Sequence, residues 1–276
     1  MDSVTWHERL ELDDPVAVIA FEGWNDGGEA ASGAVRHAWE ALGAVAVATI
    51  DHEHYADFQV TRPDIVVDGD GARHLDWPST DVGVTRVDGR DLVLVLGDEP
   101  RLRWRAYCDE VARVLADLGV RRVVLLGAFI GQVAHTLPVP VIGVADDALR
   151  ADHDLLPTSY AGPTGITGVL TATLPEAGID VVGLWAATPH YLAGNENPKA
   201  AQALLGRAGG ILGLDLRADE LLPMVDDWVG KVTEAMAEST ELRGYVESLE
   251  ASVERFEAGG DDLVTEIERF LREGDG

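Results

Sequence analysis

Uninterrupted apolar runs alternate with segments of helical spacing along most of the chain. Runs without polar positions are typical of parallel strands that are covered on both faces, and apolar residues three and four apart predict helices. We expect strands at residues 16–22, 44–50, 121–128, 138–145 and 179–187, and helices at residues 28–42, 101–118 and 164–177. This alternation predicts an α/β fold of three layers, αβα, with a mixed sheet between the helices.

Two shorter patterns predict hairpins. Residues 84–97 place Asp88 and Gly89 between β-rich flanks, and both residue types accept the positive φ angles of a tight turn. Residues 64–68, DIVVD, begin a second hairpin, whose turn is the segment GDGA. We expect these hairpins to add antiparallel strands at an edge or extension of the sheet.

The pattern changes after Leu214. Residues 218–257 carry almost no strand signal, and they contain two apolar stripes at helical spacing, which either pack within the chain or form a subunit interface. We therefore expect an α/β domain at residues 1–214 and a C-terminal helical appendage, a hairpin, at residues 215–276. A last helix is expected at residues 261–271, after Gly259 and Gly260. The stripes are Leu221, Val225, Trp228, Val232 and Ala235, and Leu242, Val246, Leu249, Val253 and Phe256.

The charge balance narrows the classes of partner. With 49 acidic residues against 21 lysines and arginines, the formal net charge is −28. This charge opposes contact with phosphate backbones and anionic membranes, so we expect no nucleic acid and no membrane as partner. The N-terminal segment lacks an apolar signal core, and no apolar run reaches the roughly 20 residues that cross a bilayer. Cys108, the single cysteine, is expected to be an inert core residue. Because one cysteine allows no disulfide within the chain, we expect the protein to be cytoplasmic.

The stretch FEGWNDGGEAASG, residues 21–33, joins a predicted strand to a predicted helix. A glycine-rich turn in this place can hold a phosphate at the helix N-terminus. However, its spacing matches neither GxGxxG nor GxxxxGK[ST], and it contains no lysine. Asp26 would repel a phosphate and suits a helix N-cap, and Glu29 completes a capping-box pattern. The pattern favours a capped turn over a phosphate loop.

Other polar candidates follow predicted strands, where ligands of open α/β sheets bind. On a strand, His52 and His54 would face one side, but their spacing matches no strong metal signature, so we expect no metal site. Arg62 suits either an anion contact or a structural ion pair. Asp98 and Glu99 suit either a binding site or the first turn of a helix.

The segment GPTGITGVL has a glycine at every third position, Gly162, Gly165 and Gly168, which allows close packing if a helix continues through it. Thr164 is a candidate cap for that helix. A threonine nucleophile needs a positioned base, and His190 is a candidate only because it also follows a strand. We expect no catalytic pair.

Five motifs occur in a fixed order: GWNDGGEAAS, DHEHYADFQVTRP, LGDEPRLRW, GPTGITGVL and TPHYLAGNENPKAA. Together they resemble the proteasome assembly chaperone 2 family in its prokaryotic form, over residues 16–213. The resemblance implies a phosphorylase/hydrolase-like fold, and relatives that assist assembly of the proteasome core particle without ATP. It provides no catalytic residues. Docking members end in a hydrophobic residue, a tyrosine and one further residue, whereas this chain ends in FLREGDG, so docking by such a tail is not expected.

Two classes of function follow. The first is an oligomeric, chaperone-like interaction protein that contacts itself, as a trimer by analogy with the phosphorylase-like fold, and proteasome subunits, without a cofactor. The second is a binding protein or hydrolase for a nucleoside- or phosphate-type small molecule, with a cleft at the strand ends. We favour the first class, which needs no enzymatic activity. The expected cleft residues are Gly23, Asn25, Asp26, Gly27, Gly28, Tyr55, Arg62, Glu99, Gly162, Thr164, Gly165 and His190.

Overall fold

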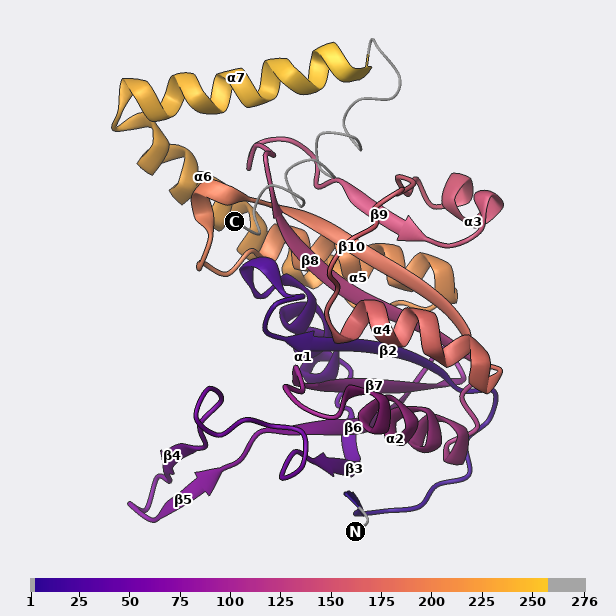
Figure 1. Ribbon diagram of the computed structural model, residues 1–276. Coiled ribbons are helices and arrows are strands. Elements are labelled where there is room, and N and C mark those ends of the chain that lie inside the picture. The colour runs from indigo at the N-terminus through magenta and orange to yellow at the C-terminus, as the bar shows by residue number, and fades with distance from the viewer. Residues whose placement is uncertain (1–2, 258–276) are drawn as a thin grey trace.

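Strands and helices alternate along the chain, as the apolar pattern predicts (Figure 1). The structure is a computed structural model that describes residues 3–257. Its strands are β1 (Val4–Trp6), β2 (Val16–Glu22), β3 (Val45–Asp51), β4 (Asp64–Val67), β5 (Arg73–Asp76), β6 (Ser79–Val87), β7 (Arg90–Asp98), β8 (Arg122–Gly131), β9 (Val141–Val144) and β10 (Asp180–Pro189). Its α-helices are α1 (Ala30–Ala41), α2 (Trp104–Asp117), α3 (Asp147–Asp152), α4 (Ile166–Thr173), α5 (Pro198–Leu212), α6 (Leu222–Ala237) and α7 (Thr240–Glu257). Short 3-10 turns lie at Gly27–Glu29, Leu174–Ala177, His190–Leu192 and Ala218–Leu221.

The main sheet has eight strands in the order β1-β3-β6-β7-β2-β8-β10-β9. The four central strands, β7, β2, β8 and β10, are parallel to one another. The outer strands are antiparallel to their inner neighbours, on one side through β6, β3 and β1 and on the other through β9. The predicted mixed sheet is confirmed.

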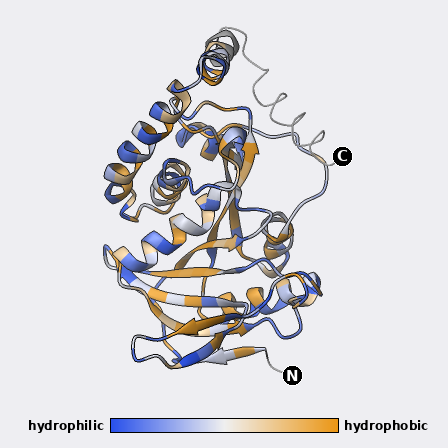
Figure 2. Ribbon diagram, turned by 90° about the vertical axis from the view of Figure 1, so that its left-hand side faces the viewer, coloured by the Kyte–Doolittle hydropathy of each residue, from blue (hydrophilic) through white to orange (hydrophobic). Residues whose placement is uncertain are grey.

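Helices cover both faces of this sheet, and each face has its own apolar core. On one face, α1 and α5 pack with strand residues that include Val18 and Leu94. On the other, α2 and α4 pack with the next residues along the same strands, Ile19 and Val95. The central strands are therefore apolar at nearly every position between their ends, and the apolar colour predominates along the strands of the sheet in Figure 2. Cys108 lies in the second core, where burial raises the pKa of its thiol, as expected for an inert core residue.

Both predicted hairpins are present, but they lie in different surroundings. β6 and β7 pair inside the main sheet, and Asp88 and Gly89 between them adopt φ angles of 52° and 86°. β4 and β5 form a separate two-stranded sheet that extends away from the body (Figure 1). This hairpin, residues 64–76, is hereafter the arm. Every strand residue of the arm is exposed.

Several helix boundaries differ from the prediction. α1 begins after Glu29 at φ 48°, and α2 begins after Arg103 at φ 55°, because both residues occupy the left-handed region outside the helix. α4 begins at Ile166 with Gly165 in the cap position, so capping by Thr164 was wrong. The rest of the predicted helix, to Ala177, is a 3-10 turn.

The apolar pattern of the sequence did not predict β1, α3 or α5. α5 is the largest of these, and it buries Leu204 and Leu205 against the core shared with α1. The Asn197 side chain caps it by accepting a hydrogen bond from the Ala200 N–H at 2.9 Å, and Pro198 occupies its first turn. These start signals were available in the sequence, but the segment is rich in alanine and glycine and lacks a clear apolar stripe.

The predicted C-terminal helices α6 and α7 are present. Leu221, from the first stripe, enters the main core, and Val246 and Leu249, from the second, pack against Ala134. Leu242 is 41% exposed, so the second stripe is only partly covered. No helix within residues 3–257 is long and apolar enough to cross a membrane. The side chains of Val253 and Phe256, the Gly259–Gly260 break, the predicted helix at 261–271 and the FLREGDG end lie outside the described residues.

The predicted sharing of one strand face by His52 and His54 was wrong. β3 ends before His52, and the following turn buries His52 and exposes His54. The Nε2 atom of His52 lies 2.9 Å from the Thr80 hydroxyl, and its ring packs edge-on against Tyr55 and Tyr107. Burial lowers the pKa of His52 to about 4.

The buried His52 should make the free energy of unfolding depend on pH. Its pKa is about 4 in the folded protein against 6.5 for the ordinary side chain, so the unfolded chain takes up a proton first as the pH falls. The contribution of neutral His52 to the free energy of unfolding is fully present above pH 6.5 and is lost as the pH falls from 6.5 to 4. At pH 5 the loss is about 2 kcal/mol. Urea unfolding at neutral pH and at about pH 5 should show a loss that is smaller by this amount in His52→Gln than in the wild type. Equal losses in the two proteins would contradict the assignment.

Candidate functional site

The parallel strands β7, β2, β8 and β10 bring their carboxyl ends to one edge of the sheet, where ligands of open α/β sheets bind. The loop after β2 crosses this edge. Its Asn25 carbonyl accepts a hydrogen bond from the Ala128 N–H of β8 at 2.7 Å, and its Gly28 carbonyl accepts one from the Asn197 N–H at 2.8 Å. The glycine-rich stretch is therefore held between β8 and the start of α5.

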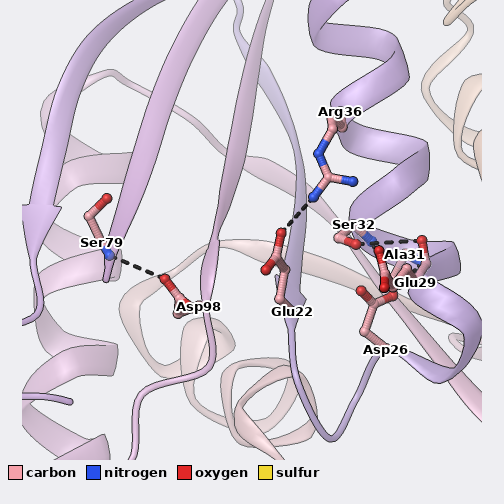
Figure 3. A network of polar contacts seen from close by, with 8 residues as sticks. All are labelled: Glu22, Asp26, Glu29, Ala31, Ser32, Arg36, Ser79 and Asp98. Carbon is pink, nitrogen blue, oxygen red and sulfur yellow. Dashed lines mark hydrogen bonds and ion pairs between the residues drawn. The ribbon is translucent and has the colours of Figure 1, made fainter. Parts of the chain in front are cut away.

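The Asp26 carboxylate accepts hydrogen bonds from the first turn of α1, as expected of a cap, although Glu29 and not Asp26 occupies the N-cap position. Its Oδ1 accepts hydrogen bonds from the N–H groups of Ala31 at 2.7 Å and Ser32 at 3.2 Å (Figure 3). Glu29 does not complete a capping box, because the Asp26 N–H donates to the Gly23 carbonyl. Burial raises the pKa of Asp26, and the hydrogen bonds from Ser32 and Ala31 partly oppose this.

Glu99 joins three segments of the chain through one buried carboxylate. Its Oε1 accepts hydrogen bonds from Asn25 Nδ2 at 2.5 Å and from the Ile166 N–H at 2.9 Å, and its Oε2 accepts one from the Trp24 N–H at 3.3 Å. Ile166 is the first residue of α4, so Glu99 accepts a hydrogen bond from the N-terminus of a helix that is distant in sequence. These four residues, Trp24, Asn25, Glu99 and Ile166, are hereafter the Glu99 cluster.

Glycines permit the close contacts around this cluster. A Cβ on Gly165 would lie 2.2 Å from Asn25 Nδ2. A Cβ on Gly27 would lie 3.1 Å from the backbone carbon of Phe129, and Gly28 has a φ of 65°. The glycines thus allow the chain to pack against itself, which favours the capped turn over a phosphate loop.

The expected cleft residues other than Arg62 separate into two groups. Away from the cluster, Tyr55 is buried beside Tyr107, Gly162 and Thr164 are exposed, and His190 Nε2 lies 3.1 Å from the Tyr245 hydroxyl. Those that gather at the sheet edge are Gly23, Asn25, Asp26, Gly27, Gly28, Glu99 and Gly165. The side chains of Asn25, Asp26 and Glu99 are buried. Their assignment to a ligand cleft stays a prediction.

A groove of about 500 Å³ opens beside the same edge, between α1, the ends of β2 and β7, the start of β6 and the base of the arm. Arg62 is the expected cleft residue that lines it. Two tryptophans, Trp39 and Trp77, also line it, together with Arg36. Its carboxylates are Glu22, Glu40, Asp64, Asp76, Asp81 and Asp98. This space is hereafter the acidic groove.

The carboxylates at the floor of the acidic groove carry perturbed pKa values. Burial raises the pKa of Glu22, the Arg36 guanidinium at 2.5 Å opposes this, and the charge of Asp98 adds to it (Figure 3). Burial also raises the pKa of Asp98, against the hydrogen bond that its Oδ2 accepts from the Ser79 N–H at 3.3 Å. A cation in this groove would relieve the repulsion between these groups.

The lining of the acidic groove fits a positively charged group. Carboxylates and aromatic side chains such as those of Trp39 and Trp77 both attract organic cations, whereas the same carboxylates repel phosphate. Within residues 3–257, no group of three or more histidine, cysteine, aspartate or glutamate side chains is arranged to hold a metal ion.

The sequence pattern of the PAC2 family matches residues 20–236. The chain belongs to the PAC2 family. A PAC2 family protein from Streptomyces avermitilis is 46% identical to this PAC2 protein, with a TM-score of 0.77 over 84% of this chain and 100% of its own. The Mycobacterium tuberculosis proteasome-assembly chaperone homologue Rv2125 is 43% identical, with a TM-score of 0.76 over 84% and 99% of the two chains. PbaB, a proteasome activator from Pyrococcus furiosus, is 18% identical, with a TM-score of 0.63 over 85% and 99%, and shares the fold.

No protein of curated function matches this PAC2 protein. The resemblance expected from the five motifs is nevertheless confirmed by the family match and by the two relatives above 40% identity.

The sequence of this PAC2 protein pointed to two residues of the acidic groove, Arg62 and Asp98, but not to the groove itself. Its lining comes from segments around residues 22, 36–40, 61–64, 76–81 and 96–98, which no single motif joins. One signal was available, because Glu22 ends a predicted strand and Asp98 directly follows another.

Removal of the Glu99 carboxylate should destabilise the protein. Glu99→Ala leaves the buried donors of Asn25 and Ile166, and the half-buried N–H of Trp24, without their acceptor, and we expect a loss of about 2–4 kcal/mol in the free energy of unfolding. Glu99→Gln keeps one acceptor oxygen and should lose less. The exposed Glu53 provides the control, since Glu53→Ala should change urea unfolding by less than about 0.5 kcal/mol. A Glu99→Ala variant as stable as this control would contradict the role of the cluster.

Proposed function

We propose that this PAC2 protein is an oligomeric, chaperone-like interaction protein that assists proteasome assembly. The observation that carries the proposal is its 43% identity, over 99% of that chain, to a proteasome-assembly chaperone homologue. The buried side chains of Asn25 and Glu99 are hydrogen-bonded to each other, and Glu99 also accepts from the Ile166 N–H, which supports a structural role for residues that would otherwise be candidates for chemistry. The proposal needs neither a cofactor nor a catalytic residue.

The arm supports this proposal, because it carries exposed apolar surface of the kind that proteins use to bind other proteins. Ile65 pairs with Leu75 and Val67 with Arg73, so these four side chains share one face. Ile65, Val67 and Leu75 are 58%, 60% and 50% exposed. An isolated two-stranded hairpin is only marginally stable in water, so a partner that covers this face would stabilise it. We assign a proteasome subunit to this face.

Three finer assignments belong to the same proposal. The sheet with helices on both faces is taken as a phosphorylase/hydrolase-like arrangement, and a homotrimer follows from that likeness alone. Residues 1–214 are taken as the α/β domain and residues 215–276 as the helical appendage. Leu214 and Leu216 lie in the main core, next to this boundary. A cytoplasmic location follows from composition.

The acidic groove favours a second candidate function, the binding of a small molecule. Its charge suits an organic cation better than the nucleoside- or phosphate-type ligand expected from the fold. Thermal unfolding with phosphate, nucleosides and spermidine tests this candidate. Stabilisation by spermidine that disappears in Asp64→Asn/Asp76→Asn would support it, and no shift with any of these probes would exclude them as ligands.

Affinity capture of the tagged protein from its own cells, at low and moderate salt, tests the first proposal. We expect proteasome α- or β-subunits to be recovered in stoichiometric amount, and proteasome assembly to slow when the protein is deleted. Recovery of the protein alone, as a defined oligomer with normal proteasome assembly, would overturn the assembly role.

The arm variant Ile65→Asp/Leu75→Asp should lose recovered proteasome subunits by at least about tenfold. Both side chains are exposed, so its free energy of unfolding should stay within about 0.5 kcal/mol of the wild type. The control Val45→Asp/Met224→Asp adds the same charge at positions that are 63% and 57% exposed outside the arm. Equal recovery with all three proteins would show that the arm is not the contact.

A further inference from the structure

A buried histidine joins the C-terminal helices to the loops at the strand ends. His135, in the loop after β8, is 2% exposed. Its Nε2 atom lies 3.1 Å from the Thr233 hydroxyl of α6, and its ring packs edge-on against Trp228 of the same helix. Its Nδ1 atom lies 2.8 Å from the hydroxyl of Tyr191, in the 3-10 turn after β10. His135, Tyr191, Trp228 and Thr233 are hereafter the His135 cluster.

The hydrogen bonds of this cluster determine the protonation state of His135. The Tyr191 hydroxyl accepts from the His135 backbone N–H at 2.8 Å, which leaves its one proton for the Nδ1 atom. The Thr233 hydroxyl donates to the Val229 carbonyl at 2.7 Å, so its oxygen accepts from the Nε2 atom. A proton on Nε2 alone satisfies both contacts, and this is the neutral imidazole.

A second proton on His135 would disrupt these bonds. The Tyr191 oxygen would then face two N–H donors, and its own proton would lose the Nδ1 acceptor. The added charge would also lie beside a cation, because the Lys199 ammonium of α5 donates to the His135 and Leu137 carbonyls, both at 2.7 Å. Burial lowers the pKa of His135, the charge of Lys199 adds to this, and the Glu250 carboxylate of α7 partly opposes it.

The same loop after β8 also holds α7. The Glu250 carboxylate accepts a hydrogen bond from the Thr136 hydroxyl, and Val246 and Leu249 pack in one apolar cluster with Ala134. α7 is therefore attached to the two residues that flank the buried histidine, so a change in the position of this loop would act directly on the helix.

We propose that the His135 cluster is a pH-sensitive switch, in which uptake of a proton by His135 releases α7 and the end of α6 from the loop after β8. Release uncovers Val246 and Leu249, which lie on the same stripe as the exposed Leu242. α6 stays attached at its start, because Leu221, directly before it, lies in the main core. This conformational change goes beyond the proposed function and requires no proteasome contact.

Hydrogen exchange of the α7 amides in the full-length protein tests the switch. A released histidine with the ordinary pKa of 6.5 binds a proton that the closed cluster disfavours. The fraction of molecules with α7 released should therefore rise by up to about tenfold between pH 7.5 and pH 5.5. Mass spectrometry of residues 241–250, corrected for the intrinsic effect of pH on exchange, gives this ratio.

Two matched variants separate His135 from the other histidines. His135→Gln cannot titrate, so the pH dependence of α7 exchange should disappear. His190→Gln removes a histidine whose Nε2 lies 3.1 Å from the Tyr245 hydroxyl of α7, and should keep the dependence. The central strands are the internal reference, because their exchange follows global unfolding and keeps the effect of His52 in both variants.

Protection of the central strands also shows that each variant is folded. If His135→Gln is not, His135→Asn takes its place, because its side-chain carbonyl can replace Nδ1 as the acceptor. Equal α7 exchange of the wild type at the two pH values would overturn the switch. A pH dependence that persists without His135, or that disappears in His190→Gln, would do the same. None of these outcomes involves proteasome capture, so failure of the switch and failure of the assembly role are separable.

Discussion

The buried carboxylate of Glu99 is the interaction on which the sheet edge depends. It satisfies donors from the loop after β2, from the Asn25 side chain and from the first residue of α4. An ionised group taken out of water is costly unless it is hydrogen-bonded, and these three donors make its burial tolerable. The same hydrogen bonds fix the loop after β2 and the start of α4 relative to the end of β7. The glycines around them follow from this arrangement, since side chains at Gly165 or Gly27 would displace the segments that Glu99 holds.

Much of the fold could be predicted from the sequence because burial on both faces leaves a clear pattern. Val16 to Glu22 and the strand around Leu125 are apolar at nearly every position. Asp88 and Gly89 indicate the turn between β6 and β7, because both residue types accept positive φ angles. The failures also have physical reasons. α5 packs through alanines and leucines without a clear stripe. The left-handed Arg103 delays α2, and no propensity indicates that conformation at an arginine.

The sites were less predictable than the fold, because contacts between side chains that are distant in the sequence leave no pattern in the spacing of residues. Asp26 was identifiable as a cap from its place before a helix. The hydrogen-bond partners of Glu99 could not be identified from the sequence, since Ile166 is distant in the chain and donates through its backbone N–H. The groove could be predicted only if the position of the arm was known, because the base of the arm forms part of its lining. Residues 64–76 contain no signal that this hairpin leaves the main sheet while the next one joins it.

The strand order has a consequence for synthesis of the protein. β2 lies between β7 and β8, although it precedes both in the chain. The hairpin of β6 and β7 is local and can close early, but β2 gains its second neighbour only after Arg122 to Leu125 of β8 have left the ribosome. Until then one edge of the apolar segment VAVIAFE has no partner strand. A nascent chain of this fold is thus exposed to aggregation through its most central strand for as long as its first half is being translated.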